Sequence, residues 1–202
     1  MNICIFGDSI VYGAYDPING GWTTLLRNYL ENKYDEVNTY SLGFCGDTTE
    51  DLLKRFENEA MARKTDFIVF SIGINDAQFI YSKNDNRVSY NDFLKNIKKL
   101  FEVAKKISQK IIFVGLTSVD ETKTTPIPWN TDKAYKNDRI RYFDQSIEQF
   151  CLENNSKFVK VNELLSKNDL FDGLHPNTAG HLKIFEAIKP IVDDVIIKFN
   201  LG

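Results

Sequence analysis

Short apolar segments alternate with longer segments of helical periodicity along this chain. Five short segments, two of them almost wholly apolar, are predicted as β-strands: residues 3–6, 37–42, 67–72, 111–116 and 157–161. Near-continuous apolar runs are typical of strands that are covered on both faces of a parallel sheet.

The segments between these strands repeat apolar residues every three or four positions, as amphipathic helices do. The clearest stripe consists of Phe93, Ile97, Leu100, Phe101 and Ala104. A last helix is expected from about Thr178, with Pro190 kinking it or splitting it in two. Five rounds of strand and helix predict a three-layer α/β domain with a parallel sheet. No internal repeat or linker interrupts the pattern, so residues 1–202 are predicted to form a single domain.

Composition and charge exclude several classes of protein. The formal net charge is −3 and no basic stripe is present, so nucleic-acid binding has no electrostatic support. No apolar run is long enough for membrane insertion, and the N-terminal residues do not resemble a signal peptide. Three scattered cysteines without a CxxC pair favour neither disulfides nor a zinc site. We therefore expect a cytoplasmic protein.

Polar, glycine-containing segments follow four of the five predicted strands. They are residues 7–9 (Gly-Asp-Ser), 43–48, 73–76 (Gly-Ile-Asn-Asp) and 171–181 (FDGLHPNTAGH). Ligands bind outside the carboxyl ends of the strands in open α/β sheets. We therefore expect all four segments to lie at one edge of the sheet and to form the site.

These segments contain a serine and the residues that could activate it as a nucleophile. A serine hydroxyl needs a base to take its proton, and histidine is the best base near neutral pH. His175 lies three residues after Asp172, a spacing that lets the carboxylate bond the imidazole Nδ1–H and leave Nε2 facing outward. Ser9 is thus the candidate nucleophile. The other histidine, His181, lies inside a predicted helix and is expected to be a packed or surface residue.

Ester hydrolysis also needs hydrogen-bond donors for the oxyanion. The N–H of Gly46, the side-chain amide of Asn75 and the N–H of Ser9 are candidates, and Gly46 has no side chain to block a substrate. Each segment alone is typical of an ordinary turn. Four of them in a fixed order, each behind its own strand, favour a catalytic site.

Other residues in these segments have simpler interpretations. Asp8 follows a strand as a phospho-accepting aspartate does, but no acidic metal-binding cluster accompanies it, so it is expected to bond the N–H groups of its own turn. Cys45 is expected to be a small buried thiol. Trp129 is expected to pack its own loop, with stacking on a sugar or acyl group as the alternative. Asp47 and Asp76 are expected to support the oxyanion loops.

The four segments resemble the sequence blocks of the SGNH hydrolases, the GDSL esterase/lipase family. FGDSIVYG resembles the first block, GFCGDTTEDL the second, GIND the third and DGLHPNTAGH the fourth. Ile10 replaces the usual Leu. In the second block Gly46, rather than Gly43, is followed by Asp-Thr as the family glycine is. The resemblance implies Ser9, Asp172 and His175 as triad, and Ser9, Gly46 and Asn75 as oxyanion hole.

The resemblance also implies a flavodoxin-like α/β/α fold with strand order 2-1-3-4-5, no metal and no cofactor. The expected function is a serine esterase acting on a small-molecule acyl ester, with a short acyl group. Acetylated sugars, lysophospholipids, thioesters and aryl esters remain open as substrates, and the oligomeric state is open. The alternatives are a catalytically idle α/β module that binds a small polar ligand at the same edge, and a metal-dependent phosphatase using Asp8.

Overall fold

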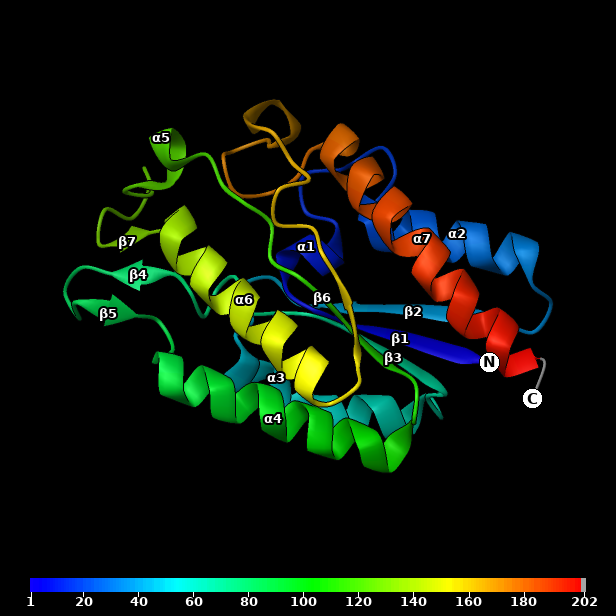
Figure 1. The fold of residues 1–202 in the computed structure, drawn as a ribbon. Helices are drawn as coiled ribbons and strands as arrows, with labels where there is room; N and C mark the ends of the chain where they lie inside the picture. Colours follow the sequence, from blue (N-terminus) through cyan, green and yellow to red (C-terminus); the bar gives the residue numbers. More distant parts are fainter. Residues whose placement is uncertain (201–202) are drawn as a thin grey trace.

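Five parallel strands form the central sheet of the computed structural model, which describes residues 1–200 (Figure 1). Across the sheet lie β2 (Asn38–Gly43), β1 (Asn2–Gly7), β3 (Phe67–Ser71), β6 (Ile111–Val114) and β8 (Lys157–Val159), in that order. Each neighbouring pair is parallel. The five predicted strands and the predicted order 2-1-3-4-5 are therefore confirmed.

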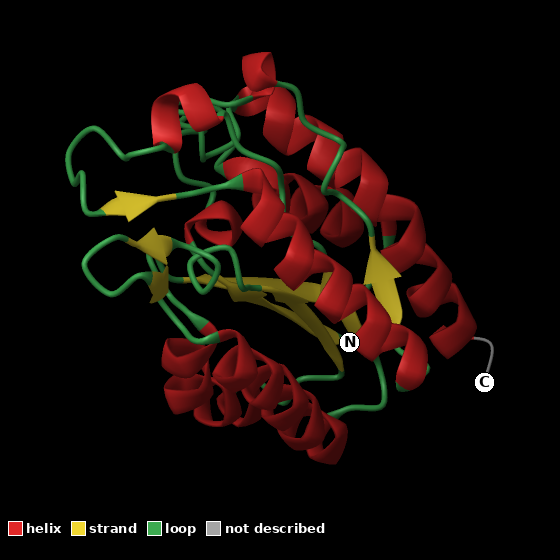
Figure 2. Ribbon diagram, turned by 60° about the vertical axis from the view of Figure 1, so that its left-hand side comes forward, coloured by secondary structure: helices red, strands yellow, loops and turns green. Residues whose placement is uncertain are grey.

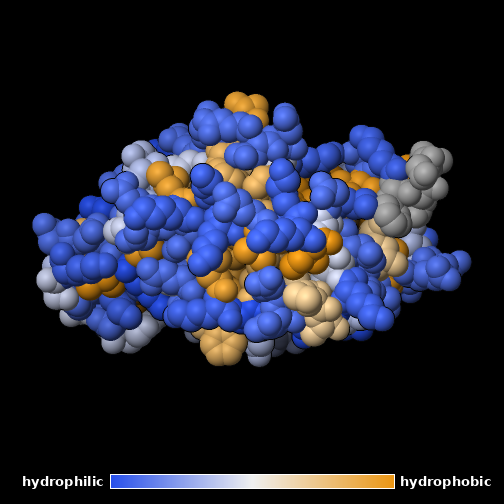
Figure 3. All heavy atoms as spheres, turned by 90° about the horizontal axis from the view of Figure 1, so that it is seen from below, coloured by the Kyte–Doolittle hydropathy of each residue, from blue (hydrophilic) through white to orange (hydrophobic). Residues whose placement is uncertain are grey.

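Helices cover both faces of this sheet, which confirms the three-layer α/β/α fold (Figure 2). On one face α2 (Gly21–Lys33) packs against α7 (Thr178–Asn200), and on the other α3 (Thr49–Ala62) packs against α4 (Tyr90–Ile107). A further helix, α6 (Asn137–Glu153), contacts both α4 and β8. Seen from the side of α4, the surface is mostly hydrophilic, with hydrophobic side chains showing between the polar ones near its middle (Figure 3).

Two of the long helices begin at capping residues that the sequence contains. Thr48 and Asp51 form the capping box that begins α3, and Ser89 caps α4 by accepting the N–H of Asp92. Pro190, in contrast, does not split α7, which runs through it without interruption. Buried apolar residues lie on both sides of the proline, so packing holds the two halves in one helix: Ile184, Ile188, Val192 and Ile196.

A small second sheet was not predicted. It contains β4 (Phe79–Ile80), β5 (Asp85–Asn86) and β7 (Lys133–Ala134), which pair antiparallel in the order β5-β4-β7. Strands of two residues leave no periodic pattern in a sequence. Because β4 lies between β3 and α4 and β7 lies between β6 and α6, this sheet joins two segments that are distant in the sequence. The remaining short elements are α1 (Ser9–Tyr12), α5 (Glu121–Thr124) and the 3₁₀ turn η1 (Lys167–Asp169).

Aromatic side chains fill the core between the sheet and α3. The ring of Phe70, on the central strand β3, lies 5.0 Å from Phe56 and 5.1 Å from Phe113 between ring centroids, and 6.1 Å from Phe6. All four side chains are buried. Contacts between rings at these separations add to the stabilisation that burial provides.

Phe70→Ala should therefore destabilise the protein by about 3–5 kcal/mol, because it removes a buried ring and leaves a cavity. The free energy of unfolding from urea denaturation measures this effect. Leu152→Ala is the matched control, since Leu152 is 73% exposed and its loss should cost about 0.5 kcal/mol or less. Equal losses in both variants would contradict the placement of Phe70 in the core.

Candidate active site

The strand-to-helix turn after β1 presents Ser9 at the edge of the sheet. Asp8 is the N-cap of α1, and its Oδ1 accepts the N–H of Ile10 at 2.9 Å, the local bond expected from the sequence. The turn requires glycine before it, since a Cβ on Gly7 would lie 2.1 Å from the carbonyl oxygen of Ser71 on the neighbouring strand. Glycine at this position therefore allows the end of β1 to lie close to β3 and to Val11 of α1.

A chain of hydrogen bonds connects Ser9 to the last predicted segment. His175 Nε2 lies 2.9 Å from Ser9 Oγ, and His175 Nδ1 lies 2.8 Å from Asp172 Oδ2. The other carboxylate oxygen, Asp172 Oδ1, accepts the main-chain N–H groups of Leu174 and His175 at 3.0 and 2.8 Å. The structure therefore brings together Ser9, Asp172 and His175, although 163 positions separate the first two.

The electrostatics of Asp172 suit a partner for an imidazole. Burial alone would raise the pKa of its carboxyl group, but the hydrogen bonds from the ring and main chain of His175 outweigh burial and lower the pKa to about 2. Asp172 is therefore ionised across the range in which proteins are stable. A fixed negative charge at this position favours the tautomer with a proton on Nδ1, so that Nε2 can accept a proton from Ser9.

Asn75 and Gly46 lie in the same cleft as Ser9 and His175. Asn75 Nδ2 donates to the main-chain oxygen of Asp47 at 3.0 Å. Gly46 has φ of +85°, and a Cβ there would meet no atom within 4 Å, so this position faces open space. Gly43 is different, since a Cβ on it would lie 2.2 Å from the backbone nitrogen of Tyr12. The geometry favours Gly46 over Gly43, as the sequence did.

The cleft has a volume of about 660 Å³ and a mixed polar and aromatic lining. Trp129 lines it and is 70% exposed, so the expectation that this side chain packs its own loop is wrong. Cys45 also lines the cleft and is exposed, so the expectation of a buried thiol is wrong as well. Both residues lie on loops that project past the sheet edge, where a sequence pattern does not report burial. The full lining is Ser9, Tyr12, Ala14, Tyr15, Cys45, Gly46, Asn75, Gln78, Ile127, Trp129, Asn130, Lys133, Tyr135, Leu174 and His175.

Two acidic residues support the loops around Gly46 and Asn75, as expected from the sequence. Asp76 is fully buried and accepts the N–H of Thr49 at the start of α3. Asp47 pairs with Arg55, whose Nε lies 2.8 Å from Asp47 Oδ2. Arg55 also donates to the main-chain oxygens of Gly7 at 3.1 Å and Leu42 at 3.0 Å. Arg55 thus joins the ends of β1 and β2 to the Gly46 loop.

Sequence reasoning missed Arg55 and a second supporting residue, Tyr135, whose hydroxyl donates to Asn75 Oδ1 at 2.7 Å. No local signal marks either residue, because both act through contacts with distant segments. His181, the second histidine, is buried in α7, where its Nδ1 accepts the N–H of Trp22 at 3.3 Å. It lies outside the cleft, and its interpretation as a packed residue is confirmed.

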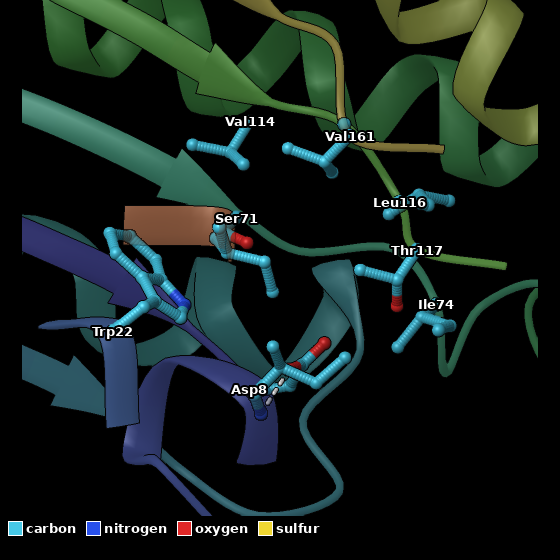
Figure 4. Close-up of a pocket in the computed structure, with 11 residues that line it drawn as sticks. Asp8, Trp22, Ser71, Ile74, Val114, Leu116, Thr117 and Val161 are labelled. Carbon is cyan, nitrogen blue, oxygen red and sulfur yellow. Dashed lines mark hydrogen bonds between the residues drawn. The ribbon is translucent and has the colours of Figure 1, made fainter. Parts of the chain in front are cut away.

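A small cavity lies behind the nucleophile turn (Figure 4). Its volume is about 10 Å³, roughly the room that one water molecule needs. Figure 4 shows Asp8 on one side, and Val114 at the end of β6 and Val161 just after β8 on the other. Two buried polar atoms that line this cavity, Trp22 Nε1 and Thr117 Oγ1, have no hydrogen-bond partner among the described residues. Burial in these surroundings raises the pKa of Asp8 to about 7.

The part of the chain that the structure describes offers no cluster of three or more His, Cys, Asp or Glu side chains arranged to hold a metal ion. Across residues 1–200, no helix has both the length and the apolar character needed to cross a bilayer.

A parallel α/β sheet with hydrogen bonds from Ser9 through His175 to Asp172 at its edge is an arrangement typical of serine hydrolases. Residues 5–183 match the model of the GDSL-like lipase/acylhydrolase family. The chain belongs to this family, which confirms the resemblance noted from its four sequence blocks.

Two relatives are similar to this chain in sequence. An acetylxylan esterase of Geobacillus stearothermophilus is 23% identical over 188 residues, covering 87% of this chain and 82% of its own. The uncharacterized lipoprotein YqeF of Bacillus subtilis (strain 168) is 29% identical over 125 residues, covering 59% of this chain and 50% of its own.

Solved structures show the same fold. The crystal structure of Axe2, an acetylxylan esterase from Geobacillus stearothermophilus, superposes with a TM-score of 0.72 at 22% identity, covering 93% of this chain and 91% of that one. LAE5, an α/β hydrolase enzyme from the metagenome of Lake Arreo, superposes with a TM-score of 0.73 at 21% identity, covering 93% and 92%.

Asp8→Asn should stabilise the protein more at high pH than at low pH. Asp8 has a pKa of about 7 in the folded protein against an ordinary value of 3.8, so the folded state keeps a proton that the unfolded chain releases. The stability of the wild type therefore falls as pH rises from about 4 to about 7, whereas asparagine cannot ionise and avoids this loss.

The measurement is the free energy of unfolding of both proteins at about pH 4.5 and about pH 8. The advantage of the variant should grow by about 3 kcal/mol over this range. Asparagine keeps an oxygen that can accept the N–H of Ile10, so the turn should be preserved. An advantage that does not change with pH would show that Asp8 is ionised in the fold.

Proposed function

We propose that this protein hydrolyses short-chain acyl esters as one catalytic domain, with Ser9 as nucleophile, and that its substrates are acetylated carbohydrates. The observation that carries the proposal is the unbroken chain of hydrogen bonds from Ser9 Oγ through His175 to Asp172. A hydroxyl with an imidazole base at hydrogen-bond distance, itself oriented by a carboxylate, is the arrangement that activates serine.

In the first half of the reaction Ser9 Oγ attacks the carbonyl carbon of the ester, and its proton passes to His175 Nε2. Asp172, ionised by virtue of its lowered pKa, stabilises the resulting imidazolium. The tetrahedral intermediate collapses when the bond to the leaving oxygen breaks, and His175 returns the proton to that oxygen. The alcohol leaves and the acyl group stays on Ser9.

In the second half a water molecule attacks the acyl-enzyme while His175 takes its proton. Collapse of this second intermediate returns the proton to Ser9 and releases the acid. The negative charge on the carbonyl oxygen is stabilised in both intermediates by the N–H groups of Ser9 and Gly46 and by the amide of Asn75. The first-turn N–H of a helix has no intrahelical partner, and Ser9 is the first residue of α1.

The proposed carbohydrate substrate rests on the aromatic rim of the cleft and on the acetylxylan esterase relative. Trp129 offers an exposed ring on one side. On the other, the ring of Tyr15 stacks on Phe171 at 4.7 Å and lies 4.9 Å from the ring of His175. Flat aromatic faces beside polar groups such as Asn130 suit the apolar faces and hydroxyls of a sugar. Lysophospholipids, thioesters and aryl esters are the competing substrates.

Ser9→Ala should lower turnover of p-nitrophenyl acetate by about a million-fold, and Asn75→Ala by about a hundred- to a thousandfold, because the first removes the nucleophile and the second one oxyanion donor. Steady-state kinetics of the purified proteins measure both, with Cys45→Ala as a control in the same cleft. A fluorophosphonate probe should label the wild type at Ser9. A protein that stays unlabelled and inactive would instead be the idle ligand-binding module.

Trp129→Ala should raise KM for an acetylated xylo-oligosaccharide by about tenfold, since stacking a sugar on an indole face is worth roughly 1–2 kcal/mol. The same variant should hydrolyse p-nitrophenyl acetate within about twofold of the wild type, because that ester carries no sugar ring. Tyr142→Ala, which removes an aromatic ring that is 54% exposed on α6, is the control and should leave the hydrolysis of both substrates unchanged. Equal losses of activity on both esters would count against a sugar ester as the substrate. A series of p-nitrophenyl esters with acyl chains of rising length tests the preference for short acyl groups.

A further inference from the structure

The side-chain amide of Asn75 has two protein partners, which together leave one N–H group available. Tyr135 donates its hydroxyl hydrogen to Asn75 Oδ1 at 2.7 Å, while Asn75 Nδ2 donates to the main-chain oxygen of Asp47 at 3.0 Å. Both side chains are only 4% exposed. An amide nitrogen carries two N–H groups. The second N–H of Asn75 therefore remains for a ligand in the cleft that Asn75 lines.

The two partners select one orientation of this amide. Turning it by half a rotation would place Asn75 Oδ1 against the carbonyl oxygen of Asp47, so that two acceptors would face each other. The turned amide would also lose the hydrogen bond that Tyr135 donates to its oxygen. It would then present a lone pair where a negatively charged oxygen has to bind, which is unfavourable. The orientation seen keeps a donor there.

The hydroxyl of Tyr135 is itself held in place by its main chain. The N–H of Tyr135 donates to the carbonyl oxygen of Thr124 at 3.0 Å. The carbonyl oxygen of Tyr135 accepts the hydroxyl groups of Thr124 at 3.0 Å and Thr125 at 2.8 Å. The preceding residue, Ala134, pairs with Phe79 in the small antiparallel sheet. If the amide of Asn75 rotated, the hydroxyl of Tyr135 could move with it only if several of these hydrogen bonds broke.

Tyr135 also stays protonated, and is therefore a hydrogen-bond donor, at neutral pH. Burial raises the pKa of its phenol well above the ordinary value, and the negative charges of Asp8 and Asp172 act in the same direction. A donor to Oδ1 polarises the amide and strengthens the hydrogen bonds that its N–H groups make. The hydroxyl thus acts on both the orientation and the donor strength of Asn75.

We infer that Tyr135 is a positioning residue that orients the amide of Asn75 toward the developing oxyanion. This inference rests on the proposed function, in which Asn75 stabilises that charge. It gives the segment between β6 and α6 a second role, because the same segment carries Trp129 at the rim of the cleft. This one segment then carries both Trp129, which is proposed to contact the substrate, and Tyr135, which orients an oxyanion donor.

Tyr135→Phe tests this inference, since it removes only the hydroxyl. The variant should lose about ten- to a hundredfold in kcat for p-nitrophenyl acetate, with KM within about twofold, because the lost interaction acts in the transition state. Active sites are counted by titration with a fluorophosphonate, so that kcat refers to folded protein. Tyr90→Phe is the matched control, because its hydroxyl bonds Ser146 far from the cleft, and it should keep full activity.

The deciding comparison repeats Tyr135→Phe in an Asn75→Ala background. There the second substitution should change kcat by less than about twofold, because the amide that Tyr135 orients is gone. A further tenfold loss in that background would overturn the inference and assign Tyr135 a general structural role. Unchanged kcat in the single variant would also overturn it, with Ser9-dependent hydrolysis left intact. Absence of Ser9-dependent hydrolysis in the wild type would instead overturn the proposed function and this inference with it.

Discussion

A parallel sheet brings the carboxyl ends of all its strands to one edge, and the whole site depends on this constraint. Ser9, Gly46 and Asn75 follow β1, β2 and β3, which are neighbours in the sheet. His175 reaches the same edge from beyond β8, with Asp172 behind it. Since β1 and β3 are buried and paired in register with their neighbours, the loops that follow them start from fixed points. The hydrogen bond between Ser9 and His175 follows from that geometry.

The carboxyl groups around the nucleophile differ in how strongly their surroundings stabilise the charged form. Asp172 receives three hydrogen bonds, two from main-chain N–H groups, and stays ionised beside the base. Asp8, one residue before the nucleophile, accepts one hydrogen bond and has a raised pKa in its small cavity. Burial also raises the pKa of Asp76, to about 6, although Thr49 donates to it. Of these three carboxyl groups, Asp172, which contacts His175, is the one whose charged form is strongly stabilised.

The walls of the cleft come from loops that have little regular structure of their own. Their order comes from pairing with one another, through the small sheet β5-β4-β7, and from contacts such as those of Arg55 with Asp47 and Tyr135 with Asn75. At the rim of the cleft an aromatic side chain can remain exposed, as Trp129 does. The lower part of the cleft is thus held by hydrogen bonds and by the small sheet, whereas its rim is exposed. This arrangement keeps the reacting groups in place and leaves room for a polar substrate to enter.

By itself, the sequence determined the three-layer α/β fold with its parallel sheet and the residues that meet at the edge of that sheet. These features follow from apolar periodicity and from short turn segments, and both are local properties of the chain. The strand order came from the resemblance to the SGNH hydrolases. Only the tertiary structure decided what surrounds that set. The small sheet, the exposure of Cys45 and Trp129, the continuity of α7 through Pro190, and the roles of Arg55 and Tyr135 all depend on contacts between distant segments. Such contacts leave no periodic pattern in the sequence. A contact between two side chains that are far apart along the chain places no constraint on the residues next to either of them.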